Sequence, residues 1–261
     1  MRSAFTLLAL VLFTPPLASA VIIAALFGVR DGPGSVYDWA PRLWGRAILR
    51  AAGVKLILHN EERATRNEPR IFVSNHVSWF DVFTLVAVLR RCKFVGKAEL
   101  FRIPLFGKAA RSAGMIAIER DNRKAAFESY RVASERIGAG ASVVVYPEGT
   151  RGATYRLRPF KKGPFVLAVA AGVPIVPTIL HGTLEVFPRT TKWRIRAGTV
   201  HVRFLEEIPT TGTTYDDRDE LAACCWQRMA DALEREHGIA SGDDLAPSAA
   251  AGVPDAFARP A

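Results

Sequence analysis

Cysteine, internal repeats and metal-binding spacings are scarce or missing in this sequence. Only three cysteines occur in 261 residues, and Cys224 and Cys225 are adjacent and cannot easily bridge. No spacing of cysteine, histidine or carboxylate residues matches a metal site, and no segment repeats. These absences exclude a disulfide-dense scaffold and a repeat architecture, and they fit a reducing compartment. We expect neither a metal nor a bound cofactor.

Acidic residues are also few relative to basic ones. The chain has 25 acidic and 35 basic side chains, for a formal charge of +10. Such an excess favours an anionic partner, such as nucleic acid, a phospholipid surface, a phosphorylated substrate or an acidic carrier protein. No recognisable nucleic-acid motif is present, which argues against the first of these. Hydrophobic residues make up 49%, which is enough for a sizeable core.

Charge is absent altogether from residues 3–29, a stretch long enough to span a bilayer. Pro15 and Pro16 predict a break near its middle. Three interpretations stay open: a membrane-spanning anchor, a broken hairpin that enters and leaves one side, and a signal peptide cleaved after Ala20. The apolar run continues past Ala20, which favours a retained anchor. More positive charge follows the segment than precedes it, so we expect the rest of the chain on the cytoplasmic side of the inner membrane.

Residues 36–52 have the pattern of an amphipathic helix. Trp39 and Leu43 belong to its apolar positions, while Arg42, Arg46 and Arg50 form a basic stripe. This pattern suits a helix that lies in a membrane interface. An ordinary surface helix that begins at Pro41 is the alternative.

Apolar runs of strand length alternate with helical patterns in the rest of the chain. We therefore expect an α/β fold with a single mixed, largely parallel sheet packed between helices. The predicted organisation is a membrane-anchoring segment with an interfacial helix at 1–52, the α/β domain at 53–237, and a disordered tail at 238–261. The expected strands are 54–59, 71–75, 93–95, 115–118, 142–146, 174–180 and 200–204.

His76 stands where the predicted strand 71–75 ends and a helix begins. Ser78 is a candidate N-cap, and Asp81 follows as the acidic member of a capping box. A histidine with a carboxylate one turn further on can act as a base and its orienting partner. The alternative is a helix start with no catalytic role.

Two further strand ends carry polar residues. Arg120 follows the strand at 115–118, and the run 148–151, Glu-Gly-Thr-Arg, follows the strand at 142–146. Ligands bind at the carboxyl ends of strands in such sheets. A threonine hydroxyl and two arginines can hold phosphate oxygens, and Lys97 adds a positive charge.

Four blocks in order resemble the glycerolipid acyltransferase family, which includes the 1-acylglycerol-3-phosphate acyltransferases. The resemblance covers about residues 35 to 210. Ala117 stands where the family often has Phe, so the acceptor pocket is expected to differ in shape. The matching blocks are 75–81 (Asn-His-Val-Ser-Trp-Phe-Asp), 114–120 (Gly-Met-Ile-Ala-Ile-Glu-Arg), 147–151 (Pro-Glu-Gly-Thr-Arg) and 173–177 (Val-Pro-Ile-Val-Pro).

The resemblance implies transfer of an acyl group from acyl-CoA or an acyl carrier protein to the hydroxyl of a lysolipid at a membrane, with 1-acylglycerol-3-phosphate giving phosphatidate. His76 would take the proton of the hydroxyl, and Asp81 would orient it. A thioester has a good leaving group, so no serine nucleophile is required. The residues that the resemblance assigns to binding or shaping the phosphate site are Lys97, Arg120, Glu148, Gly149, Thr150 and Arg151.

Other functions compete with this one. The same motifs serve an acyltransferase for another lysolipid, such as a lyso-ornithine lipid. A hydrolase of lipid esters or thioesters would use the same histidine and aspartate to activate water. A non-catalytic membrane or nucleic-acid binder is a third class. Basic clusters at 156–162 and 189–203 suit lipid headgroups, coenzyme A phosphates or an acidic carrier protein.

Overall fold

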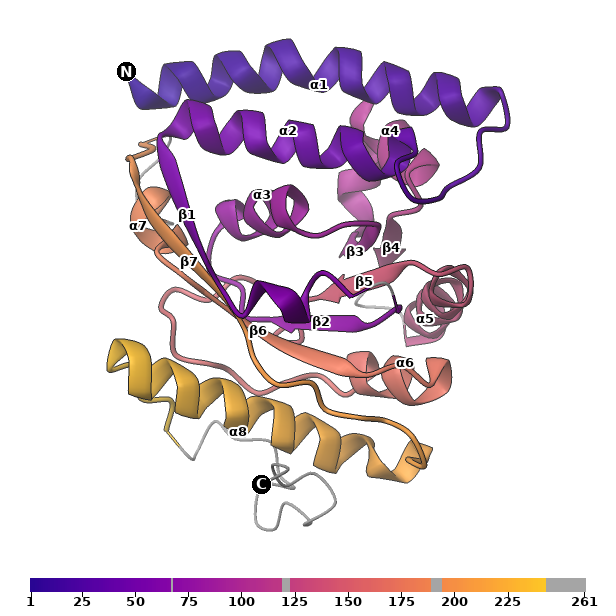
Figure 1. Ribbon diagram of the computed structural model, residues 1–261, viewed down its shortest axis with the longest axis vertical. Helices are drawn as coiled ribbons and strands as arrows, with labels where there is room; N and C mark the ends of the chain where they lie inside the picture. The colour runs from indigo at the N-terminus through magenta and orange to yellow at the C-terminus, as the bar shows by residue number, and fades with distance from the viewer. Residues whose placement is uncertain (67, 119–122, 189–193, 243–261) are drawn as a thin grey trace. The chain divides into compact units, whose positions relative to one another are not determined.

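Seven strands form one mixed, mostly parallel sheet between helices, in the order β1-β7-β6-β2-β5-β3-β4 (Figure 1). The computed structural model describes residues 1–66, 68–118, 123–188 and 194–242. The strands are β1 (Val54–His59), β2 (Ile71–Ser74), β3 (Cys92–Lys97), β4 (Ile116–Ile118), β5 (Ser142–Val145), β6 (Ile175–His181) and β7 (Gly198–Phe204). The predicted fold class is confirmed.

The helices follow the predicted pattern closely. The helix predicted at 36–52 is α2, whereas the short helix α7 after β6 was not predicted. The helices are α1 (Arg2–Leu26), α2 (Val36–Ala52), α3 (Trp79–Val88), α4 (Phe106–Ser112), α5 (Arg123–Gly138), α6 (Gly163–Ala171), α7 (Thr183–Val186) and α8 (Arg218–His237), with short 3-10 turns at Glu61–Arg63, Ala98–Arg102 and Tyr215–Asp217.

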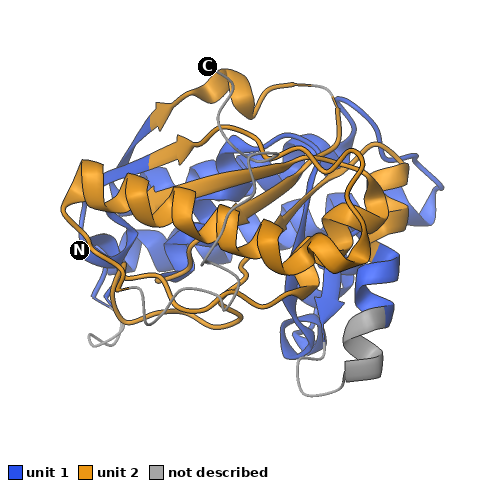
Figure 2. Cartoon of the chain, turned by 90° about the horizontal axis from the view of Figure 1, so that it is seen from below, with its two compact units in different colours: residues 1–57, 78–132, 181–201 blue, residues 58–77, 133–180, 202–261 orange. Residues whose placement is uncertain are grey.

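The chain divides into two compact units by its internal contacts (Figure 2). Unit 1 comprises residues 1–57, 78–132 and 181–201, and unit 2 comprises residues 58–77, 133–180 and 202–261. The predicted boundary at 52/53 stays a prediction. Most of the predicted tail, from residue 243 onward, lies outside the described residues.

In unit 2, β2 lies between two parallel neighbours. Its residues Ile71 and Val73 pair with Val143 and Val145 of β5 on one side, and with β6 on the other. All four β2 residues are buried, as expected of a central strand in a parallel sheet. The helix α8 packs beside α6, and Trp226 is its largest fully buried side chain. This arrangement places the carboxyl ends of β2 and β5 side by side.

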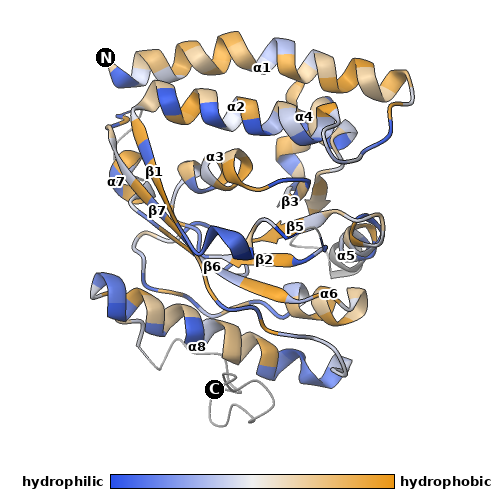
Figure 3. Cartoon of the chain, viewed as in Figure 1, coloured by the Kyte–Doolittle hydropathy of each residue, from blue (hydrophilic) through white to orange (hydrophobic). Residues whose placement is uncertain are grey.

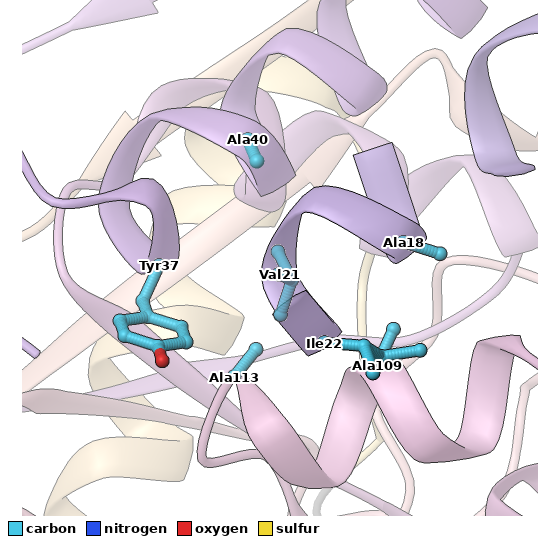
Figure 4. Close-up of a cluster of buried hydrophobic side chains, with 7 residues drawn as sticks. All are labelled: Ala18, Val21, Ile22, Tyr37, Ala40, Ala109 and Ala113. Carbon is cyan, nitrogen blue, oxygen red and sulfur yellow. The ribbon is translucent and has the colours of Figure 1, made fainter. Parts of the chain in front are cut away.

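In unit 1, α1 and α2 run antiparallel and in contact (Figure 1). Small side chains let them approach each other and α4 closely (Figure 4). The buried cluster that joins the three helices comprises Ala18, Val21, Ile22, Tyr37, Ala40, Ala109 and Ala113. On its other side α2 meets α3, where a Cβ on Gly45 would lie 2.8 Å from the Phe83 carbonyl oxygen. Glycine is therefore required for this helix contact.

The predicted break at Pro15 and Pro16 is wrong, because α1 continues through both prolines. Each proline removes one backbone donor, but both side chains face outward and are exposed. Trp44 of α2 donates its indole N–H to the Thr14 hydroxyl at 2.9 Å, immediately before the pair. Packing along α2 and α4 holds the helix together across the interruption. Pro41 likewise lies inside α2 and does not mark its start.

By length and composition α1 is the one described helix that could cross a membrane. It has 25 residues, and its most apolar 18-residue window has a mean hydropathy of 2.3 and is 17% buried. Beyond its polar start the helix is apolar along most of its length (Figure 3), and one face of it points away from the cluster with α2 and α4. Exposed side chains on this face include Phe5, Leu8, Val11, Leu12 and Leu26. Apolar exposure of this extent marks a surface that meets a lipid or protein partner.

Candidate functional site

His76 follows β2 in a turn that is fixed at its start by Asn75. The Asn75 amide donates to the Leu180 carbonyl at 2.9 Å and accepts from the Leu180 N–H at 2.8 Å. These two bonds tie the end of β2 to the end of β6. Asn75 is buried, so replacing it would leave backbone groups of Leu180 without partners. These bonds therefore fix the path of the backbone where it leaves β2 and enters the His76 turn.

Both backbone groups of His76 bond to the segment that follows β5. The His76 N–H donates to Glu148 Oε1 at 3.0 Å, and the His76 carbonyl accepts from the Gly152 N–H at 2.7 Å. The imidazole stacks on the Tyr146 ring, with centroids 4.0 Å apart and planes 19° from parallel. The half-buried His76 is thus held by its backbone and by its ring.

Tyr146 is the residue that sequence reasoning missed here. The parallel register pairs Val73 of β2 with Val145 of β5, so the residues just beyond each strand lie next to one another. The sequence allows the two strands to be predicted as neighbours. It does not predict that the Tyr146 ring stacks on His76, because stacking depends on the orientation of both side chains. An aromatic ring beside an imidazole limits its rotation without changing its charge.

Glu148 binds protein groups on both carboxylate oxygens. Its Oε1 accepts from His76, and its Oε2 accepts from Arg158 Nε at 3.0 Å. The same guanidinium donates to Thr150, at 3.0 Å to the hydroxyl and also to the backbone carbonyl. Burial raises the pKa of Glu148, and the bonds from His76 and Arg158 oppose that rise. The predicted part of Glu148 and Thr150 in substrate binding stays a prediction.

Arg158 is held in turn by its own neighbours in unit 2. Leu157 is fully buried, and the Arg158 carbonyl accepts from the Trp226 indole N–H at 3.3 Å. The guanidinium side chain is 36% exposed, whereas that of Glu148 is 2% exposed. Arg158 therefore links the 147–151 turn to α8. The sequence identified Arg158 only as a member of the basic cluster at 156–162.

Gly149 is a position at which the backbone demands glycine. Its φ is +78°, and a Cβ there would lie 2.8 Å from Lys161 Cε. The Lys161 side chain consequently lies directly over the turn. The backbone N–H of Lys161 donates to the Pro147 carbonyl at 2.9 Å. In the described part of the chain the Lys161 ammonium has no ion-pair partner, whereas Lys162 pairs with Asp219 at 2.7 Å. Arg151, the last residue of the turn, is half-buried.

Asp81 completes the predicted capping box at the start of α3, which is confirmed. Its Oδ2 accepts from the Ser78 N–H at 2.7 Å, and its Oδ1 accepts from the Thr183 hydroxyl at 2.5 Å. The residue is fully buried. Ser78 donates its hydroxyl to the Phe187 carbonyl at 3.2 Å, which fits a structural role.

The remaining predicted residues are Lys97 and Arg120. Lys97 ends β3 opposite Ile118 of β4, is 55% exposed, and pairs with Glu99 at 2.8 Å. The hydrogen bond from Lys97 lowers the pKa of Glu99. Arg120 lies outside the described residues. The structure therefore brings His76, Glu148 and Thr150 together within unit 2, while Asp81 and Lys97 belong to unit 1.

The three cysteines are poor candidates for a nucleophile. Burial raises the pKa of the thiols of Cys92, Cys224 and Cys225. A raised pKa disfavours the thiolate, which is the nucleophilic form. Across the described ranges, no group of three His, Cys, Asp or Glu side chains could hold a metal ion.

The chain is similar to known acyltransferases. The acyltransferase family model matches residues 55–181. The chain is 34% identical to human 1-acyl-sn-glycerol-3-phosphate acyltransferase beta, across 75% of this chain and 73% of that one. It is 36% identical to a chloroplastic 1-acyl-sn-glycerol-3-phosphate acyltransferase of Brassica napus, but this match spans 54% of the chain and only 41% of the relative's length.

A solved structure shares the fold. The crystal structure of the 1-acyl-sn-glycerophosphate acyltransferase PlsC from Thermotoga maritima matches with a TM-score of 0.70 at 22% identity. The match covers 93% of this chain and 100% of that one.

Proposed function

Because the chain belongs to the acyltransferase family that includes the 1-acyl-sn-glycerol-3-phosphate acyltransferases, as its motifs predicted, we propose that it makes phosphatidate. The acyl group comes from a thioester of coenzyme A or an acyl carrier protein. The acceptor is the free hydroxyl of 1-acylglycerol-3-phosphate. No metal or other cofactor takes part in this scheme.

His76 is the general base of the proposed reaction. It accepts the proton of the acceptor hydroxyl as the oxygen attacks the thioester carbonyl carbon. The tetrahedral intermediate then expels the thiolate as the C–S bond breaks, and the imidazolium returns the proton to sulfur. The observation that carries this role is the fixing of His76 at the carboxyl end of β2, by both backbone groups and by Tyr146.

Asp81 is the proposed orienting partner of His76. Its carboxylate would accept from one ring nitrogen, fix the tautomer and stabilise the imidazolium. Two features support this role. Asp81 stands five residues after His76, in the first turn of α3, and its buried carboxylate is held in place by the bonds from Ser78 and Thr183.

Cationic side chains of the chain would bind the acceptor phosphate. We assign this role to Lys97, Arg120 and Arg151, and we add Lys161 because its ammonium lies over Gly149 without an ion pair among the described residues. Arg158 is excluded from the set, since its guanidinium already binds Glu148 and Thr150. Glu148 and Thr150 would shape the site through these bonds.

Membrane attachment would come from the apolar face of α1. The helix is about 37 Å long, enough to span a bilayer. However, its other face packs on α2 and α4, and Thr14 and Ser3 bond to Trp44 and Ile195 of the same unit. A helix docked in this way can lie along a bilayer surface with its outer face among lipids. We therefore propose attachment to one side of the inner membrane, with the site facing the cytoplasm.

The test is transfer of an acyl group from oleoyl-CoA to lysophosphatidate by the full chain in detergent. Wild type, His76→Gln and the control His59→Gln are compared, beside a panel of other lysolipids and a no-acceptor sample. We expect phosphatidate from wild type and from the control, and a loss of at least about 100-fold in His76→Gln. Transfer only to another lysolipid would move the substrate. Free fatty acid without acceptor would favour a hydrolase and overturn the proposal.

A further inference from the structure

A groove in unit 1 combines an apolar wall with two arginines. It has a volume of about 390 Å³ and runs between the first turns of α1 and the last turn of α2. The apolar wall consists of Phe5, Leu8 and Leu12, and the arginines are Arg2 and Arg50. Figure 3 shows the contrast between the polar start of α1 and the apolar helix that follows.

The two arginines are held at the same end of the groove. A Cβ on Gly53 would lie 3.0 Å from Arg2 Cζ, so the Arg2 guanidinium rests against the C-cap of α2. Arg50 belongs to the last turn of α2 and is exposed. Among the residues that the structure describes, neither guanidinium has a carboxylate partner. None of the described residues that line the groove is acidic.

This combination defines the chemistry of an occupant. Two cations without an acidic neighbour favour a phosphate, which arginine binds through two parallel hydrogen bonds. The adjoining wall of Phe5, Leu8 and Leu12 favours a hydrocarbon chain attached to that phosphate. A zwitterionic headgroup would find no carboxylate for its ammonium. The volume is at the small end of the range for ligand sites, about 300–1,000 Å³, and suits a headgroup with the first part of one chain.

We propose that this groove binds one anionic phospholipid of the membrane, with its phosphate between Arg2 and Arg50 and one acyl chain along Leu8 and Leu12. The wall of the groove continues into the exposed apolar face of α1. A bound lipid would therefore add a headgroup-specific contact to a face that otherwise recognises only hydrocarbon. This site does not depend on the proposed reaction.

The experiment measures binding of dihexanoyl phosphatidylglycerol to the full chain in a neutral detergent by titration calorimetry. Dihexanoyl phosphatidylcholine and glycerol phosphate are run as comparison ligands. We expect saturable binding of one phosphatidylglycerol per chain, at least about tenfold tighter than phosphatidylcholine. Arg50→Ala and the double variant Arg2→Ala/Arg50→Ala should each weaken it, the double variant by about tenfold or more. The matched control is Arg90→Ala, an exposed arginine beyond α3, which should bind as wild type does.

Two further measurements distinguish binding of a phospholipid from binding of a phosphate without acyl chains. Leu8→Asp should weaken phosphatidylglycerol and leave any glycerol phosphate binding unchanged. Equal affinity for glycerol phosphate and phosphatidylglycerol would identify an anion site and overturn the lipid assignment. Binding unchanged in Arg50→Ala and the double variant, or equally weakened in Arg90→Ala, would overturn the site itself. Acyl transfer in detergent should persist in every variant, which verifies folding and keeps this result separate from the proposed function.

Discussion

Asp81→Asn separates the structural role of this residue at the start of α3 from its proposed catalytic role. The carboxylate caps α3 through Ser78 and accepts from the Thr183 hydroxyl. In the amide, the remaining oxygen can still accept from the Ser78 N–H. The new NH₂ can donate to Thr183, whose hydroxyl accepts as well as donates. Both structural bonds are retained, and only the negative charge is lost.

The expected stability change is therefore small and the catalytic change large. We expect Asp81→Asn to lower the free energy of unfolding by less than about 1 kcal/mol. Asp81→Ala should cost about 2–4 kcal/mol, because it removes the cap and leaves the buried Thr183 hydroxyl without its acceptor. In the proposed mechanism the Asp81 charge stabilises the imidazolium, so kcat of Asp81→Asn should fall by about 10²- to 10⁴-fold.

The assay follows release of the coenzyme A thiol with lysophosphatidate as acceptor, and guanidinium unfolding is measured in the same detergent. Thr183→Val is the matched control: it removes the donor to Asp81 and keeps the charge, so its kcat should stay near that of wild type. A folded Asp81→Asn protein with kcat within about threefold of wild type, less than 1 kcal/mol of barrier, would refute the reasoning.

Two more predictions concern the 147–151 turn. Burial raises the pKa of Glu148 above its ordinary 4.5, so the folded state holds this proton more tightly than the unfolded chain does. As the pH rises from 4.5 through the raised pKa, the free energy of unfolding of wild type should therefore fall relative to that of Glu148→Gln. Unfolding curves measured at several pH values test this prediction. A difference between the two proteins that does not change with pH would contradict it. Lys161→Met should raise KM for lysophosphatidate by roughly 5- to 30-fold, as expected for loss of one charged contact of about 1–2 kcal/mol. Lys162→Met should not, because Lys162 already pairs with Asp219, and equal KM values in the two variants would remove Lys161 from the site.

The local part of the site was predictable from the sequence. The start of α3, its Ser78 cap and the Asp81 member of the capping box depend on residues within one turn of each other, and the structure has all three. The alternation of apolar runs and helical patterns likewise predicted the α/β sheet. Short-range backbone geometry and hydrophobic periodicity are properties of contiguous residues, so no tertiary information was needed.

The tertiary structure decided what depends on residues far apart in the chain. Pro15 and Pro16 predict a broken helix, but packing on α2 and α4 keeps α1 continuous. Tyr146 reaches His76 only because β2 and β5 are neighbours, although the intervening chain contains other strands. Arg158 binds Glu148 because α8 and the buried Leu157 fix its loop. In each case the deciding contact forms only when the chain has folded, so local pattern carries no signal for it.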